Sequence, residues 1–390
     1  MVTFCRLYAD DSSLQHSSNN LRSIETCLNS DLTKLQAWSE KWLLKFNPSK
    51  TKALFFTRNR DPEYPKLNFQ QCQLQFVDQH KHLGIIFSPD LSWSHYIDTI
   101  LANANKKLGI MKKYKFKINR NTLSLMYKSF IRPQLEYASE VWGTCLNQNE
   151  SEKLEKLQLN AARIVTGLTL LASRESLYLE TGWEPLNQRR KLTRLKTMYK
   201  VDKQLTPNYL RDIFPSKFSS YNTRNTLNYS VPKCKLQLYK HSFVPTVINE
   251  WNSLPENIKT SESIVTFMNK VKTKQNSPPV YFACGIRRLN ILHTRLRHNC
   301  ILNKDLFRCN IINSPLCTCG KIEDEYHYFF TCPRYKDARN VLFNNIFKIN
   351  NLHIVNTHVL LWGDNSISIS DNKYLFSVVQ VFIKQSGRFD

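Results

Sequence analysis

The sequence lacks any uninterrupted apolar stretch of the length needed to cross a membrane. A membrane-spanning helix needs about 18 or more consecutive apolar residues, and no run in these 390 residues reaches that length. Residues 1–6 do not match the pattern of a signal peptide. Internal repeats and low-complexity tracts are also absent. We therefore expect a cytoplasmic or nuclear protein with no membrane partner.

The cysteines do not form the pattern of a disulfide framework. There are 11 of them, an odd number, scattered through apolar segments, whereas disulfide-rich domains are short and pair their cysteines. This favours a reducing compartment. With 42% hydrophobic residues, the chain can bury about two or three modest cores.

Acidic residues are scarce relative to basic ones. The chain has 55 Lys and Arg against 31 Asp and Glu, which gives a net charge of +24 and a pI near 9.6. Because such a field attracts phosphate polyanions, we expect RNA and DNA as partners.

Much of this positive charge falls into three groups that we predict to bind nucleic acid. Basic group 1 contains Lys106, Lys107, Lys112, Lys113, Lys115, Lys117 and Arg120, interleaved with Met111, Tyr114 and Phe116. Basic group 2 contains Arg189, Arg190, Lys191, Arg194, Lys196 and Lys200, and basic group 3 contains Arg287, Arg288, Arg295, Arg297 and His298. Basic side chains can follow a nucleic-acid backbone while aromatic rings stack on bases. For any single residue, a solvated helix face with the aromatics in the core is the alternative.

Two adjacent carboxylates, Asp10 and Asp11, stand between short segments at 3–7 and 12–14 that look extended. At a turn between two strands, such a pair can hold Mg²⁺ through hard oxygen ligands and leave coordination positions open for phosphates. Asp-Asp-Ser-Ser is also ordinary turn chemistry, so a plain turn is the alternative.

Hydrophobic periodicity predicts an α+β arrangement for the first part of the chain. Apolar residues recur every three or four positions from Leu21 to Trp42, which indicates an amphipathic helix over 21–46. A β-rich run at 53–57 and a hairpin at 82–88 follow. Beyond residue 89 helical patterns dominate, with helices expected at 93–113, 122–142, 151–166, 184–203, 243–251, 261–274, 334–347 and 373–389.

A cluster of metal-ligand residues follows basic group 3. It contains Cys317, Cys319, His327 and Cys332, spaced as CxC, seven residues, His, four residues, Cys. Three thiolates and one imidazole make a closed tetrahedral set for a structural Zn²⁺. The alternative is a reduced, cysteine-rich core with His327 hydrogen-bonded at the surface, and Cys309 is a possible substitute ligand.

The order of these motifs makes the chain resemble the reverse transcriptase of non-LTR (LINE-type) retrotransposons, particularly jockey-like elements. The residues that carry the resemblance are Tyr8-Ala9-Asp10-Asp11, the stretches 46–52 and 82–88, Ile131-Arg132-Pro133 and Trp142-Gly143, and the cysteine cluster. The resemblance implies a palm hairpin in which Asp10 and Asp11 bind Mg²⁺, and Lys50 near the phosphates of the incoming nucleotide. It also implies a primer grip at 82–88, a helical thumb and a C-terminal zinc knuckle.

In that family a further metal-ligating Asp lies upstream of the paired acids, and here only nine residues precede Asp10. We therefore expect a truncated RNA-directed DNA polymerase that keeps nucleic-acid binding but is inactive alone. One alternative is a polymerase fragment completed in trans by the missing N-terminal part. The other is a non-enzymatic, zinc-dependent nucleic-acid-binding protein.

The expected fold is α+β, divided into five segments. Residues 1–89 form a partial palm with two hairpins and a helix, 90–204 a helical thumb-like region, and 205–279 a loosely structured connector with short helices. Residues 280–347 hold a basic helix and the zinc-knuckle-like region, and 348–390 form a C-terminal helical tail.

Overall fold

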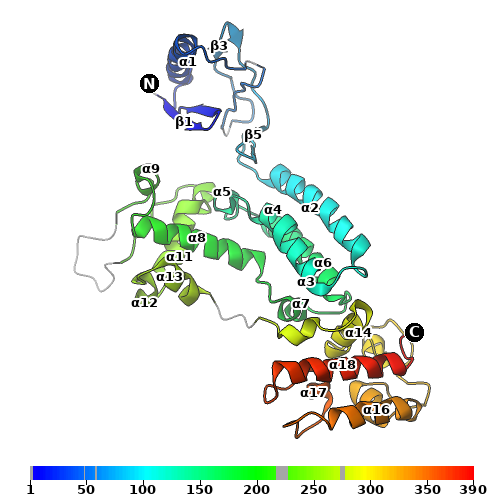
Figure 1. Ribbon diagram of the computed structural model, residues 1–390. Helices are drawn as coiled ribbons and strands as arrows, with labels where there is room; N and C mark the ends of the chain where they lie inside the picture. Colours follow the sequence, from blue (N-terminus) through cyan, green and yellow to red (C-terminus); the bar gives the residue numbers. More distant parts are fainter. Residues whose placement is uncertain (1–2, 48, 58, 217–226, 273–276) are drawn as a thin grey trace. The chain divides into compact units, whose positions relative to one another are not determined.

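The computed structural model describes residues 3–47, 49–57, 59–216, 227–272 and 277–390 (Figure 1). It divides into two compact units, Met1–Thr99 and Ile100–Asp390. Small sheets in the first unit and helices throughout the second agree with the coarse α+β prediction. The finer division into five segments stays a prediction, and residues 217–226 and 273–276 of the predicted connector lie outside the described residues. None of the helices that the structure describes is long and apolar enough to cross a membrane.

The first unit combines short hairpins with one long helix. Its elements are β1 (Phe4–Tyr8), β2 (Asp11–Gln15), α1 (Leu21–Lys41), β3 (Asn68–Phe69), β4 (Cys72–Gln73), β5 (His80–His82) and β6 (Ile85–Phe87). β1 pairs with β2, β3 with β4 and β5 with β6, all antiparallel. α1 begins after Asn20, whose side chain accepts a hydrogen bond from the backbone N–H of Arg22. It ends at Lys41, five residues short of the predicted end at 46.

One face of α1 covers a small core. Leu32 is buried there with Phe69 and Leu74, and each such side chain contributes about 1.5–3 kcal/mol of burial free energy. Asp31, also buried, accepts hydrogen bonds from the backbone N–H and the hydroxyl of Thr3 at 2.9 and 2.8 Å. These bonds hold the start of the β1–β2 hairpin on α1.

The strand predicted at 53–57 is wrong. Ala53 makes an isolated parallel bridge with Phe76, and residues 54–57 form no strand. Phe55 instead packs against Tyr64 and Phe76, with ring centroids 5.9 and 6.3 Å away. β propensity reflects the fit of a side chain against a neighbouring strand, and the described residues place no strand beside 54–57.

The second unit is helical. Its helices, the first of which starts in the preceding unit, are α2 (Ser94–Tyr114), α3 (Arg120–Met126), α4 (Arg132–Glu136), α5 (Ser139–Trp142), α6 (Gln148–Thr166), α7 (Arg174–Thr181), α8 (Leu186–Asp202), α9 (Asn208–Arg211), α10 (Gln237–Lys240), α11 (Phe243–Asn252), α12 (Glu256–Lys259), α13 (Ile264–Val271), α14 (Arg287–Arg297), α15 (Asn303–Arg308), α16 (Lys336–Ile346), α17 (Thr357–Trp362) and α18 (Ile369–Gln385). Wider π-helical turns lie at Tyr127–Ile131 and His327–Thr331, and tight 3₁₀ turns at Val280–Ala283 and Pro333–Tyr335.

Local signals set the ends of α6, which confirms the helix predicted at 151–166. Asn147 and Glu150 form a capping box at its start, in which each side chain accepts from the other residue's backbone N–H. Gly167 ends it with φ +79°, a left-handed conformation that costs glycine little. The helices predicted at 93–113, 184–203 and 243–251 are likewise observed as α2, α8 and α11.

The single helix predicted at 122–142 is wrong, because the chain there breaks into α3, a π-helical turn, α4 and α5. Pro133 lies in the first turn of α4 and has no N–H to continue a regular helix. The backbone N–H of Arg132 bonds the carbonyl of Tyr127, five residues earlier. Ala138, with φ +49°, then separates α4 from α5.

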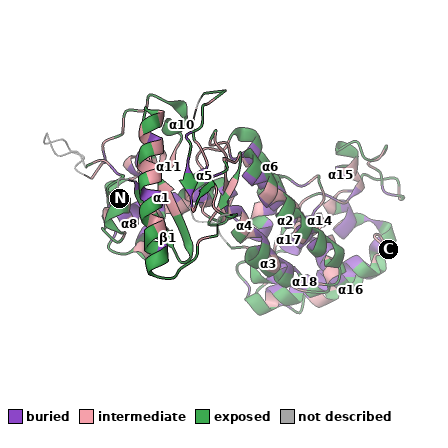
Figure 2. Cartoon of the chain, turned by 90° about the horizontal axis from the view of Figure 1, so that it is seen from above, coloured by how far each residue is buried: buried purple, intermediate pink, exposed green. Residues whose placement is uncertain are grey.

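Two apolar cores are prominent among the described residues of the second unit. In one, α11 and α13 pack against α8, and Met198, Trp251 and Phe267 are fully enclosed. Two helices of the predicted loose connector, α11 and α13, are therefore packed on α8. In the other, α14, α16 and α17 surround α18, with Phe376 and Phe382 at the centre. Figure 2 marks the buried residues in purple.

Candidate functional site

The paired acids lie at the tip of the β1–β2 hairpin, as the sequence predicts. Asp11 is paired with Tyr8 across the hairpin, and Ala9 at the turn has φ +52°. Both carboxylates are exposed. Among the described residues, no third acid, His or Cys joins them in a group that could hold a metal ion. The hairpin therefore presents two oxygen ligands toward solvent.

The hairpin predicted at 82–88 as a primer grip is observed as β5 and β6, which pair over 80–87. The pKa of His80 on β5 is lowered by burial and by His82, while the nearby Asp11 carboxylate acts in the opposite direction. Leu83 and Gly84 form the turn between the two strands, both with positive φ.

Lys50 is exposed in a turn where its backbone N–H bonds the carbonyl of Asn47 at 3.1 Å.

Basic group 1 covers the last turns of α2 and the segment after it. Its exposed lysines are Lys106, Lys112, Lys113 and Lys117. The Lys107 ammonium donates to the carbonyl of Phe130 at 3.0 Å, and the Lys115 ammonium lies 4.7 Å from the centre of the Phe116 ring. Phe116 is 63% exposed, so an aromatic face stands among lysines at the surface.

Several arginines of the predicted groups are buried and form internal ion pairs. Arg120 pairs with Glu180, and Arg194 with Glu250. Arg190 is also buried, with its guanidinium 5.8 Å from the centre of the Trp142 ring. These guanidinium groups make their contacts inside the protein. The solvent-exposed positive charge of basic group 2 therefore comes from Lys191 and Lys196, together with the half-buried Arg189 and Lys200.

Basic group 3 lies on α14, and two of its arginines donate hydrogen bonds to backbone carbonyls at the C-terminal end of α6. Arg287 donates to the carbonyls of Val165 and Ile164, both at 2.7 Å, and to Lys115 at 2.9 Å. Arg295 donates to the carbonyl of Gly167 at 2.8 Å. Cationic side chains at a helix C-terminus offset its partial negative charge. Burial, with the nearby Arg120, lowers the pKa of Arg287 to about 10.

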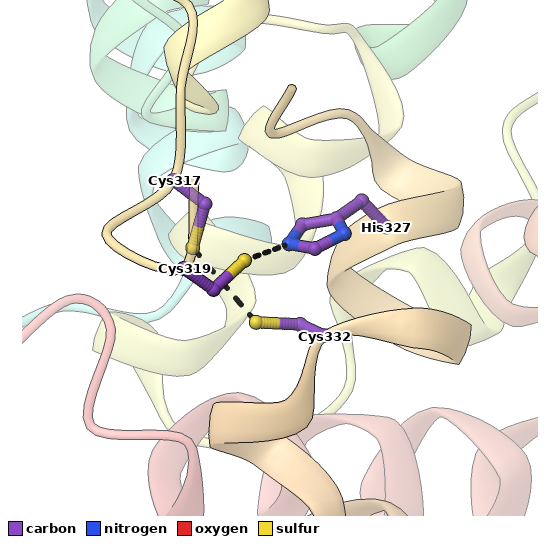
Figure 3. A group of neighbouring side chains, drawn as sticks. All are labelled: Cys317, Cys319, His327 and Cys332. Carbon is purple, nitrogen blue, oxygen red and sulfur yellow. Dashed lines mark hydrogen bonds between the residues drawn. The ribbon is translucent and has the colours of Figure 1, made fainter. Parts of the chain in front are cut away.

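The cysteine cluster converges as its spacing predicts (Figure 3). The ligand atoms of Cys317, Cys319, His327 and Cys332 all lie within 4.8 Å of one another. Cys317 Sγ lies 3.8 Å from Cys332 Sγ, and Cys319 Sγ lies 3.2 Å from Nε2 of His327. A tetrahedral zinc with Zn–S bonds of about 2.3 Å places two sulfurs about 3.8 Å apart. The donor set and its dimensions therefore fit zinc.

Two local features bring these ligands together. Gly320, with φ +85°, turns the chain after Cys319, and its N–H bonds the carbonyl of Cys317 at 2.8 Å. The π-helical turn at His327–Thr331 lets the N–H of Cys332 bond the carbonyl of His327, five residues earlier, at 2.8 Å. Such widened turns are frequent at functional sites.

Neighbouring groups orient the imidazole and the loop. Nδ1 of His327 lies 3.1 Å from the hydroxyl of Thr331, which leaves Nε2 facing the sulfurs. Glu323 is buried beside the cysteine loop and receives two bonds from Arg388, at 2.7 and 2.8 Å. Arg388 thus holds the cysteine loop in place through its bonds to Glu323. Sequence patterns gave no sign of Thr331 or Arg388, since neither belongs to the ligand spacing.

The thiols of the cluster differ in acidity. Burial opposes ionisation of Cys317, but hydrogen bonds from Cys319 outweigh it and lower the pKa. Burial, together with the neighbouring Cys317, raises the pKa of Cys332 to about 11. A bound cation is what would keep all the sulfurs deprotonated together at neutral pH. Cys309 is exposed and stands outside the cluster.

Comparison with known proteins gives two related sequences. The chain is 28% identical over 166 residues to a probable RNA-directed DNA polymerase from transposon BS of Drosophila melanogaster, covering 41% of this chain. It is 23% identical over 165 residues to a probable RNA-directed DNA polymerase from transposon X-element of the same organism, covering 40% of this chain. The matched region spans 18% of the length of each relative. No protein-family model matches the chain.

Proposed function

We propose that the chain is a C-terminal part of the RNA-directed DNA polymerase of a LINE-type retrotransposon, and that its own task is to hold RNA and DNA. The observation that carries the proposal is the similarity to two transposon polymerases, together with exposed lysines and an exposed ring at basic group 1. Lysines on an exposed helix surface neutralise phosphates and release their counterions. The exposed ring of Phe116 can stack on an unpaired base.

In this proposal the acidic hairpin is a portion of the polymerase metal site. Asp10 and Asp11 would hold Mg²⁺, which neutralises charge on the transferring phosphates, and Lys50 would approach those phosphates. Two-metal phosphoryl transfer needs ligands on both sides of the metal pair, and the described residues supply two exposed carboxylates. The polypeptide by itself is therefore proposed to bind nucleic acid without extending a primer.

The second metal site in the proposal is structural. Cys317, Cys319, His327 and Cys332 would hold one Zn²⁺ in a closed tetrahedral set, which leaves no position for a reacting water. The metal would join the loop of the first two cysteines to the turn that carries the other two ligands. Because Cys317 and Cys332 are part of the core around α18, metal binding and folding of that core would be coupled.

Binding to nucleic acid is tested by fluorescence anisotropy with labelled RNA and DNA from 50 to 300 mM KCl. We expect affinity to fall steeply with salt, because counterions are released on binding. Replacing Lys106, Lys113 and Lys117 by Gln should lower the slope of log affinity against log salt by about 2, since each phosphate contact contributes about 0.7–0.9.

The matched control replaces Lys233, Lys235 and Lys240, three exposed lysines outside the basic groups, by Gln. It removes the same charge and should leave the slope nearly unchanged. Equal effects of the two triple variants would show that only net charge matters. Affinity that does not change with salt would refute the proposal.

A further inference from the structure

A cavity of about 600 Å³ lies between the C-terminal half of α2, the end of α6 with the loop that follows it, and α14. These segments come from residues 105–116, 160–170 and 287–295, all within the second unit. The volume falls in the range of small-molecule sites, about 300–1,000 Å³. The cavity is therefore large enough for one nucleotide.

The charge of this cavity has one sign. Its lining includes the cations Lys112, Lys115, Arg163, Arg287 and Arg295, and no carboxylate is among the described residues that line it. Lys112 and Lys115 belong to basic group 1 and the last two arginines to basic group 3, so the cavity is where these groups meet. Arg163 belongs to neither group. The concentration of like charge in a concave site favours an anionic occupant.

Two of the cavity arginines, Arg163 and Arg295, are held in place and still have N–H donors to offer. An arginine has five N–H donors. Arg295 uses one of them on the carbonyl of Gly167, and Arg163 uses one on Asn160. Nε of Arg163 is buried without a hydrogen-bond partner, which is costly unless a ligand or water satisfies it. Fixed guanidinium groups with unused N–H donors are suited to phosphate oxygens.

The uncharged part of the lining is mostly apolar, with Asn105, Asn160 and Thr169 as its polar side chains. Leu108, Ile164, Leu168 and Ile291 line the cavity, and so does Phe116, which is largely exposed. A nucleotide combines an anionic phosphate with a flat base whose faces stack on apolar and aromatic side chains. A base paired in a duplex cannot turn into such a cavity without unpairing. An unpaired nucleotide can do so.

We infer that this cavity takes one nucleotide unit of single-stranded RNA or DNA, with the phosphate against the cationic side and the base against the apolar wall. The inference rests on the proposed nucleic-acid binding and adds a site that distinguishes single strands from duplexes. Basic group 1 outside the cavity would serve both kinds of nucleic acid, since it contacts the backbone.

Gly109 provides the test, because it lines the cavity and a Cβ added to it meets no atom within 4 Å. Gly109→Leu would fill part of the cavity without removing a charge or a hydrogen bond, and Gly109→Ala is the matched control. Both changes favour a helix over glycine, so both variants should unfold at a temperature no lower than the unchanged chain.

Binding would be measured by anisotropy with a labelled ten-nucleotide single strand and with the duplex of the same sequence. We expect Gly109→Leu to weaken single-strand binding about tenfold, the size of losing one stacked base, with Gly109→Ala within about twofold. Duplex binding should stay within about twofold in both variants. Lys112→Ala should weaken single-strand binding more than Lys156→Ala, which removes an exposed lysine of α6 outside the cavity.

The outcomes separate the inference from the proposed function. If the unchanged chain binds neither probe, the proposed function fails. If it binds, but Gly109→Leu and Gly109→Ala bind the single strand equally and Lys112→Ala behaves like Lys156→Ala, the cavity is not a nucleotide site while the proposed function stands. An equal loss of affinity for the single strand and for the duplex in Gly109→Leu would also overturn the inference.

Discussion

The carboxylate of Glu180 lies 2.5 Å from the guanidinium of Arg297, and both side chains are almost completely buried. Arg120 approaches the other carboxylate oxygen at 2.6 Å. These contacts join α3, α7 and α14 through one buried anion. Burial disfavours the charge of Glu180, but Arg297 and Arg120 more than offset this and hold its pKa below the usual range.

The first prediction concerns this buried cluster. Glu180→Gln should lower the free energy of unfolding by about 3–5 kcal/mol, because it leaves two buried guanidinium groups without a counter-charge. Urea denaturation measures the change. Glu175→Gln is the control, since Glu175 is exposed on the same helix, and it should change stability by less than about 0.5 kcal/mol. Similar values for the two variants would contradict the ion-cluster account.

The second prediction concerns the pH dependence of stability. His293 is buried, with Nε2 donating to the carbonyl of Leu360 at 3.0 Å, and burial together with Arg297 lowers its pKa to about 3. In the unfolded chain this imidazole binds a proton near pH 6.5, whereas in the folded chain it stays neutral at that pH. The contribution of His293 to the free energy of unfolding is therefore fully present above pH 6.5 and is lost as the pH decreases. The expected slope for one such group is about 1.4 kcal/mol per pH unit.

His293→Gln is the matched variant, because Gln can keep the N–H donor to Leu360 and does not titrate. Between pH 7 and pH 5 the unchanged chain should lose about 2 kcal/mol more stability than the variant. Burial raises the pKa of Asp305 to about 6, which acts in the opposite sense in both proteins and cancels in the difference. Parallel stability curves would exclude a buried neutral His293.

The third prediction concerns zinc. Metal analysis of freshly reduced protein should find about one zinc per chain, and Cys332→Ser should abolish it, because one of four ligands is lost. Loss of the metal should also lower the protection of residues around the cluster in hydrogen exchange. Cys309→Ser removes an exposed cysteine outside the cluster and should keep the zinc. Full zinc content in Cys332→Ser would refute the assignment.

The fourth prediction concerns the acidic hairpin. On an annealed template and primer with deoxynucleotides and Mg²⁺, the polypeptide alone should give no extension, because the described residues place no third carboxylate beside Asp10 and Asp11. If a second polypeptide supplies that ligand, extension should appear and should disappear in Asp10→Asn. Asp61→Asn, at another exposed acid of the same unit, should retain it. Extension by the polypeptide alone would overturn the proposed division of the metal site.

Features encoded by neighbouring residues were predictable. The end of α6 at Gly167, the hairpin at Asp10 and Asp11, and the convergence of the four metal-ligand residues all depend on short spacings. The absence of a strand at 54–57 was not predictable, because whether a β-rich run forms a strand depends on a partner that the local sequence does not contain. The break in the helix over 122–142 had a local signal, Pro133, whose missing N–H outweighs the helical pattern.

The fate of each basic residue could not be predicted from periodicity. Arg120 looks like Lys117 in the sequence, yet it is buried because Glu180, sixty residues later, supplies its counter-charge. The cationic cavity likewise combines residues as far apart as Asn105 and Arg295. Such sites depend on how helices pack, and a helical pattern alone does not determine which helices meet.

The bonds between Arg388 and Glu323 have a practical consequence for anyone who expresses this protein. These bonds place Arg388 against the cysteine loop. An affinity tag joined directly to Asp390 would therefore disturb the ion pair that holds this loop in place. A flexible spacer before the tag, or a tag at the other end, should preserve the zinc content that is predicted above.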